Sequence, residues 1–223
     1  MTELYQYVGA NLYLQPTPAG AYQAVAGPER TPERRLLLAL MRAPLSTKAR
    51  LDELAWCSEL TDHTTLDVLY HAQERGWVEG FHSPQGPPTG ALEPIAEHAV
   101  QSLSSTGHGL LSDAQGFCVA SHGFDGAAAE FLAAVSADIA SLHERHAASL
   151  ADASGTSTGA WAMVDMAGNS RVGFWPLFVG DHRFVLALGG LPTLNRPSLV
   201  QLVWALNVRY GAGSPATNRS EMS

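Results

Sequence analysis

Two short runs of the sequence contain residue types that enzymes use. Residues 155–159, Gly-Thr-Ser-Thr-Gly, match the G-x-S-x-G pattern, in which a serine nucleophile lies on a sharp turn between a strand and a helix. Here a predicted helix precedes the run and a predicted strand follows it, so the order of elements is reversed. No helix N-terminus follows to supply an oxyanion hole. The run is therefore interpreted as a loop.

The second run is His143-Glu144-Arg145-His146, which brings two imidazoles to one side of a predicted helix. The metalloprotease motif H-E-x-x-H places its second histidine four positions after the first, and this sequence is one residue short. It also lacks a cysteine pair or an obvious third ligand nearby in the sequence. We therefore expect no metal and no other cofactor.

The remaining candidates for catalysis have simpler explanations. Asp113, Asp165 and Asp181 lie in predicted turns, where a short acceptor side chain bonds the backbone. The chain has a single lysine, Lys48, which does not end a glycine-rich loop, so a nucleotide-binding loop of the G-x-x-x-x-G-K-[ST] type is excluded. With no catalytic constellation, the sequence predicts a protein that is not an enzyme.

The composition indicates a globular chain in a reducing compartment. Of the 223 residues, 46% are hydrophobic and 15% are charged, which suffices for a core and is too little charge for a disordered chain. Apolar runs are far shorter than the roughly 20 residues that span a bilayer. Cys57 and Cys118 lie on apolar segments without a second pair, as buried free thiols do. We expect a cytoplasmic location and no membrane insertion.

Among the elements that must position these residues, three helices are predicted in the first part of the chain. Thr31 and Pro32 open the first, Ser46 caps the second, and Thr61 or Asp62 caps the third, which stops at Gly76. A short strand over 77–81 follows. Residues 1–28, with a turn over 16–20 and a strand over 21–25, are expected to cover this part.

Three helices, a strand and a Pro/Gly-rich return are the pattern of a winged helix-turn-helix, and residues 69–79 resemble the end of its recognition helix. Such a helix needs basic or amide side chains to bind DNA. Residues 61–75 instead carry Asp62, Asp67 and Glu74 against Arg75 alone. Five cations do cluster on the first two helices, namely Arg34, Arg35, Arg42, Lys48 and Arg50, but residues 1–92 still sum to −3 and the whole chain to −8. DNA binding is therefore disfavoured.

The second part is predicted as helix, two strands, helix, three strands and helix. The helices cover about 92–103, 126–150 and 197–210, and the strands cover 110–112, 117–120, 161–166, 171–179 and 183–188. The long middle helix is expected to bury an apolar stripe on the sheet, formed by Phe131, Val135, Ile139 and Leu142.

The run at 109–121, Gly-Leu-Leu-Ser-Asp-Ala-Gln-Gly-Phe-Cys-Val-Ala-Ser, leads into this alanine-rich helix. It resembles the signature hairpin of the dynein light-chain roadblock family, and the order of elements from about 92 to 210 resembles that family too. The expected fold is α/β (α+β): a C-terminal five-stranded antiparallel sheet with helices on both faces, preceded by a winged helix-turn-helix. The expected divisions are 1–82, a linker over 83–91, a roadblock-like domain over 92–210 and a disordered tail over 211–223.

The resemblance implies a homodimeric scaffold that binds a small Ras-like GTPase and could regulate it, in bacteria often one tied to polarity or motility. The alternative is a winged-helix transcriptional regulator whose C-terminal half senses a ligand and dimerises. For the dimer, the expected interface comprises Trp161, Met163, Asp165, Ala134 and Ala137. For the GTPase, the expected contacts are Glu130, Asp138, Ser141, Glu144 and Arg145.

Overall fold

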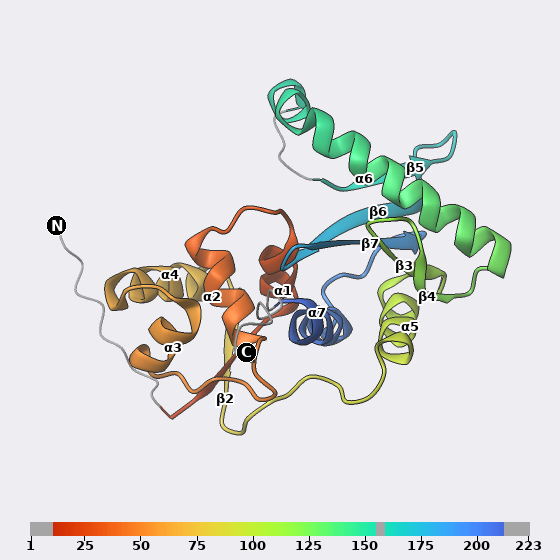
Figure 1. Cartoon of the computed structure of the whole chain (residues 1–223). Coiled ribbons are helices and arrows are strands. Elements are labelled where there is room, and N and C mark those ends of the chain that lie inside the picture. The colour runs from red at the N-terminus through yellow and green to blue at the C-terminus, as the bar shows by residue number, and fades with distance from the viewer. Residues whose placement is uncertain (1–10, 155–158, 212–223) are drawn as a thin grey trace, which may run out of the picture.

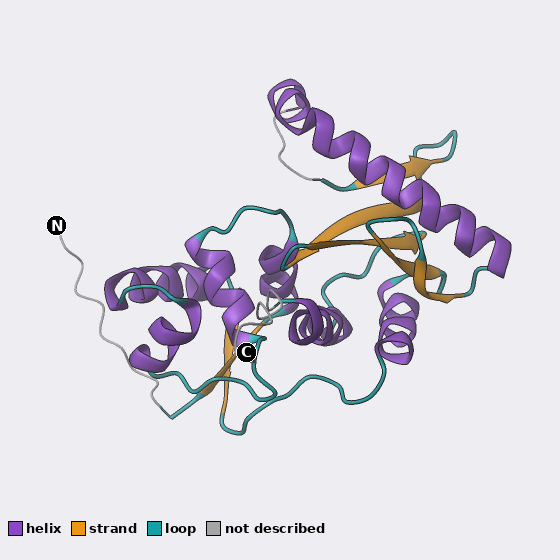
Figure 2. Ribbon diagram, viewed as in Figure 1, coloured by secondary structure: helices purple, strands orange, loops and turns teal. Residues whose placement is uncertain are grey.

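The computed structural model describes residues 11–154 and 159–211. The predicted tail over 211–223 therefore lies outside the described residues from 212 onward, and so do residues 155–158 of the Gly-Thr-Ser-Thr-Gly run. Figure 1 shows the elements in chain order, and Figure 2 shows helices on both faces of one larger sheet. The mixed α/β class and this architecture were predicted from the sequence, and both are confirmed.

The larger sheet contains five antiparallel strands in the order β4-β3-β7-β6-β5. These strands are β3 (Gly109–Asp113), β4 (Cys118–His122), β5 (Trp161–Val164), β6 (Ser170–Val179) and β7 (His182–Gly189). All five match the strands expected from the sequence to within a few residues. β7 lies in the centre and is buried along most of its length, whereas β4 and β5 form the two edges.

Two of the hairpin turns of this sheet are built by aspartates whose side chains bond nearby backbone amides. One Asp113 carboxylate oxygen accepts hydrogen bonds from the amides of Gln115 and Phe117, each at 2.9 Å. Asp165 does the same for the amides of Ala167 and Asn169, at 2.9 and 3.0 Å. These turns account for both aspartates without catalysis, as their positions in the sequence indicate.

One face of the sheet is covered by the long helix α6 (Gly126–Ser154), which crosses it diagonally in Figure 1. The predicted apolar stripe on this helix is wrong. Phe131 and Leu142 are 68% and 41% exposed, while Val135 and Ile139 are only partly buried at the flank. The residues that α6 buries are mostly small, and they are Ala129, Leu132, Ala133, Ser136, Ala137 and Ala140. Small side chains let the helix axis approach the sheet closely, which leaves the larger side chains outside.

The other face carries the larger core. Helices α5 (Leu92–Leu103) and α7 (Pro197–Tyr210), both with the predicted bounds, pack on the sheet and on each other. α7 also packs against α1 (Pro18–Val25) of the N-terminal part. Trp204 on α7 is 1% exposed, and its Nε1 donates a 3.0 Å hydrogen bond to the carbonyl of Ala43. One continuous set of buried side chains therefore runs from the sheet into the N-terminal part.

Three helices of the N-terminal part follow the prediction. They are α2 (Pro32–Leu40), α3 (Leu51–Ser58) and α4 (Asp62–Glu74). Thr31 and Thr61 cap α2 and α4, each accepting a bond from the amide three residues on, and Gly76 has the expected positive φ of 64°. The expected cap of α3 is wrong, because Ser46 is five residues before the first residue of the helix, Leu51, and its hydroxyl accepts a bond from the amide of Gln85 at 2.9 Å.

The expectation for residues 1–28 is also corrected. Residues 21–25 lie in a helix, α1, rather than in a strand, because Thr17 caps it and Pro18 occupies its first turn. The strand is β1 (Tyr13–Pro16), which pairs antiparallel with β2 (Val78–Phe81). The start of α1 is held at this sheet, where the Thr17 hydroxyl donates to the Gly76 carbonyl at 2.6 Å.

The pairing of β2 bears on the winged-helix interpretation. A wing is a hairpin in which the strand after the recognition helix pairs with the strand that follows it. Here β2 pairs with β1, which precedes the helices, and residues 82–91, all of them described, form no strand. The three-helix arrangement is present, whereas the winged-helix assignment and the division into two domains stay predictions.

Candidate functional site

The first candidate surface is the β5 edge, defined as Trp161–Val164. β5 pairs with β6 on one side, and the described residues provide no strand on the other. Met163 and Val164 are 43% and 61% exposed there. An open strand with apolar side chains is a template for pairing with another chain.

Among the predicted dimer residues, Trp161 is half-buried and packs beneath α6. Its indole Nε1 lies 3.3 Å from Nδ1 of His143 on α6, and the two rings meet edge to face. Trp161 therefore fixes the β5 edge to the helix above it, and only part of the ring remains at the surface. Asp165 is engaged within its own turn, and the backbone amide of Asn169 is the main cause that lowers the pKa of its carboxyl.

The two predicted interface alanines are placed differently. Ala134 is exposed on α6, so it is available to a second copy of the helix. Ala137 is only 9% exposed and faces the turn between β3 and β4, next to Gly116. The structure therefore puts Ala137 in the packing between helix and sheet rather than on a free surface.

The second candidate surface is the outer face of α6, defined as Glu130, Phe131, Asp138, Leu142 and Arg145. All five side chains are exposed. Phe131 and Leu142 lie near Asp138 on the side of the helix that points away from the sheet, as the helical spacing of 3.6 residues requires. The surface therefore combines two large apolar side chains with both signs of charge, which is the composition of many protein interfaces.

Ser141 and Glu144, the other two predicted GTPase contacts, are bound by Arg183 of β7. The Arg183 guanidinium lies 2.7 Å from a Glu144 carboxylate oxygen and donates to the Ser141 hydroxyl at 3.2 Å. The side chain of Arg183 is only 11% exposed, so the bridge lies at the boundary between α6 and the sheet. These two residues hold the helix in place, and they are less available to a partner than Asp138 or Arg145. Arg183 was not predicted as a site residue, because it belongs to no recognisable sequence motif.

The described residues show no group suited to hold a metal. No cluster of three or more His, Cys, Asp or Glu side chains with metal-site geometry occurs among them. His143 is used by Trp161, while His146 is exposed. Cys57 and Cys118 are free and half-buried, and burial raises the pKa of both thiols. The two surfaces defined above therefore remain the candidate sites among the described residues.

The acidic character of α4 is also visible in the structure. Nδ1 of His63 lies 3.2 Å from a carboxylate oxygen of Asp67, and Tyr70 donates to Glu74 at 2.9 Å. The guanidinium of Arg75 lies over the ring of Trp77, 4.8 Å from its centre. Three acidic side chains, Asp62, Asp67 and Glu74, therefore face solvent around this helix against one arginine at its end, and the helix has no basic face for a phosphate backbone.

Across residues 11–154 and 159–211, none of the helices combines the length and apolar character needed to cross a membrane. No protein-family model matches the chain, and no curated protein matches it. Two solved structures do. The chain is similar to a roadblock/LC7 domain from Streptomyces avermitilis, at 16% identity and a TM-score of 0.36, over 54% of this chain and 93% of that one. It is also similar to the gliding protein MglB from Thermus thermophilus, at 18% identity and a TM-score of 0.32, over 56% of this chain and 94% of that one.

Proposed function

We propose that this chain is a homodimeric scaffold that binds a small Ras-like GTPase and acts by binding rather than by catalysis. The observation that supports it most is that two surfaces with exposed apolar side chains, the β5 edge and the outer face of α6, belong to elements that the contact between Trp161 and His143 joins. The resemblance of residues 109–121 to the roadblock hairpin supports the class of partner.

Dimerisation is proposed to occur through the β5 edge. Antiparallel pairing with the β5 of a second copy would satisfy the open backbone groups and cover Met163 and Val164. The exposed Ala134 would allow the two α6 helices to approach. The dimer would then present two outer faces of α6 to a partner.

A charge at the β5 edge should weaken this dimer. Met163→Lys would place two ammonium groups close together across the two-fold axis, where like charges oppose pairing. We expect the dimer dissociation constant to rise about tenfold or more, which corresponds to about 1.4 kcal/mol. Sedimentation velocity over a concentration series reaching tens of micromolar would measure it.

The control is Phe117→Lys, which makes the same kind of change near β4, the opposite edge of the sheet, where Phe117 is 71% exposed. This variant should dimerise as the wild type does. A wild-type chain that stays monomeric, or a dimer that responds to Phe117→Lys and ignores Met163→Lys, would refute the assignment of the edge.

The outer face of α6 is proposed to contact the GTPase. Interfaces depend on a few apolar anchors, and the surrounding charges mainly set register and association rate. Phe131 and Leu142 supply the anchors, and Glu130, Asp138 and Arg145 supply the charges. Arg145 lies on a regular helix, so it is assigned to binding, and not to insertion into a nucleotide site as an arginine finger.

Reversing the charge at the centre of this face should reduce GTPase binding. Asp138→Arg is expected to weaken the complex with a Ras-like GTPase from the same genome about tenfold, because it leaves a cation opposite the surface that accepted a carboxylate. Isothermal titration would measure the affinity. Glu93→Arg, an equal charge change on the exposed surface of α5, is the matched control. Equal binding by Asp138→Arg and wild type, with both dimeric, would rule out this surface.

A further inference from the structure

A separate candidate site, with no α6 residue in its lining, is a pocket where the N-terminal part meets the sheet. The pocket has a volume of about 240 Å³. Its walls come from α2, the C-terminal end of α3, the turn between β6 and β7, and the end of α7. Four arginines line it, namely Arg30, Arg34, Arg35 and Arg42, against two carboxylates, Glu29 and Glu59. This is a third of the arginines of a chain whose net charge is −8.

Three of these arginines are matched to acids. Arg30 lies 3.5 Å from Asp181 and Arg34 lies 3.8 Å from Glu29. Arg34 is also structural, because it is buried and its Nε donates to the carbonyl of Ala24 at 3.0 Å. Arg30 and Arg34 therefore contribute little uncompensated positive charge to the pocket.

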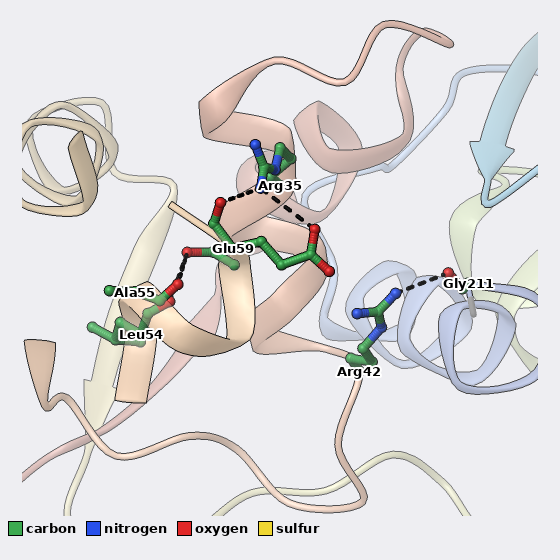
Figure 3. Close-up of polar contacts among 7 residues, drawn as sticks. Arg35, Arg42, Leu54, Ala55, Glu59 and Gly211 are labelled. Carbon is green, nitrogen blue, oxygen red and sulfur yellow. Dashed lines mark hydrogen bonds and ion pairs between the residues drawn. The ribbon is translucent and has the colours of Figure 1, made fainter. Parts of the chain in front are cut away.

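Arg35, the third, clamps the end of α3. Its guanidinium donates to the backbone carbonyl of Glu59 and lies 3.5 Å from the Glu59 carboxylate, as Figure 3 shows. Glu59 has a positive φ of 55°, the one such non-glycine residue among those described. The left-handed conformation costs a residue with a side chain about 1 kcal/mol or more, and the clamp by Arg35 holds it there.

Arg42 is different. Within the described residues it forms no ion pair, and its hydrogen bond to the carbonyl of Gly211, which Figure 3 also shows, is long at 3.4 Å. The Cys57 thiol in the same pocket adds no negative charge, because burial raises its pKa. The pocket therefore holds one guanidinium, that of Arg42, with no paired carboxylate among the described residues, and a second one, that of Arg35, whose side chain is 34% exposed.

We propose that this pocket binds the phosphoryl group of a small phosphate ester or of free phosphate. Guanidinium groups present forked donors that match phosphate oxygens, and a phosphate dianion has enough acceptors to bond two arginines at once. Arg42 supplies a guanidinium that has no acidic partner among the described residues, and Arg35 supplies a second bidentate donor. Leu38 and Phe178 line the same pocket and offer apolar contact to the organic part of an ester.

Titration calorimetry of the full chain with phenyl phosphate and with inorganic phosphate tests the proposal. Both probes are expected to bind. Arg42→Gln should weaken binding about tenfold or more, the loss expected of a charge-assisted hydrogen bond. Arg42 is exposed, so this variant should fold. Glu59→Gln, which removes the competing carboxylate, should bind at least as tightly as wild type.

The matched control is Arg50→Gln, which removes the same charge from an exposed arginine paired with Asp52 outside the pocket. It should alter the affinity by no more than about twofold. Tighter binding of phenyl phosphate than of phosphate would identify an ester as the ligand class, and equal binding would identify free phosphate. Failure of both probes to bind, equal losses in Arg42→Gln and Arg50→Gln, or benzoate binding as tightly as phenyl phosphate would overturn the proposal.

Discussion

Trp204→Ala is expected to lower the free energy of unfolding by about 3–5 kcal/mol, the range for truncating a large buried aromatic side chain. Trp204 is 1% exposed and lies on α7 between the sheet and the N-terminal part. The variant also leaves the Ala43 carbonyl without its 3.0 Å hydrogen bond from the indole. The loss should appear as one earlier transition for the whole chain in urea, followed by both fluorescence and circular dichroism.

Two variants separate the contributions of this residue. Trp204→Phe removes the hydrogen bond and part of the indole but keeps an aromatic ring, so it leaves a smaller cavity and should cost less than Trp204→Ala. Trp56→Ala removes an indole that is 84% exposed and should change stability by no more than about 0.5 kcal/mol. Two separate unfolding transitions in the wild type, with Trp204→Ala shifting one alone, would show that the two parts are independent.

The packing of Trp204 joins two parts of the chain that the sequence predicts as separate domains. The Pro/Gly-rich run at 83–91 predicts a linker between two domains, and the structure does place those residues outside helices and strands. Nothing in the run reveals that α7, more than a hundred residues further on, packs against α1. Local composition reports where the backbone cannot form regular structure. It does not report which buried surfaces meet across that gap.

The elements of the sheet and the last helix were predictable because local rules and tertiary packing agree there. Pro197 opens α7 with a φ suited to the first turn, and apolar residues then recur at helical spacing to Tyr210. The turns at Asp113 and Asp165 are set by side chains that bond neighbouring amides. Each of these features depends on residues within a few positions of one another.

The orientation of α6 could not be predicted in the same way. An alanine-rich helix with a few larger apolar residues has two faces that could pack on a sheet, and hydrophobicity favours the larger side chains. The structure buries the face with Ala133 and Ala140 and leaves Phe131 exposed. Close approach of helix and sheet decided the outcome, and that depends on the shape of the sheet.

The candidate contact residues on α6 could likewise be predicted only in part. Glu130, Asp138 and Arg145 are exposed as expected, whereas Glu144 and Ser141 are bound by Arg183, 42 positions after Ser141 in the sequence. Polar residues on a helix are expected at its solvent face by default. A partner from a distant strand changes that assignment, and a single sequence does not show such a pair.

The second large effect is expected at Gly180, in the turn that joins β6 to β7. Gly180 has a positive φ of 58°, and a Cβ at this position would overlap the backbone carbonyl oxygen of Tyr210 at the end of α7. Gly180→Ala should therefore lower the free energy of unfolding by about 2–4 kcal/mol, combining about 1–2 kcal/mol for the left-handed conformation with the cost of displacing the backbone.

The matched control for this substitution is Gly168→Ala, in the turn between β5 and β6. Gly168 also has a positive φ, of 84°, but a Cβ there would meet no atom within 4 Å. Gly168→Ala should lower the free energy of unfolding only by the cost of the left-handed conformation, about 1 kcal/mol. The difference between the two variants in urea unfolding isolates the contact between the turn and α7.

Because Gly180 and Gly211 both line the arginine pocket, Gly180→Ala should also weaken binding of phenyl phosphate, whereas Gly168→Ala should leave it unchanged. Equal stability losses in the two variants would mean that the end of α7 does not pack against the turn at Gly180.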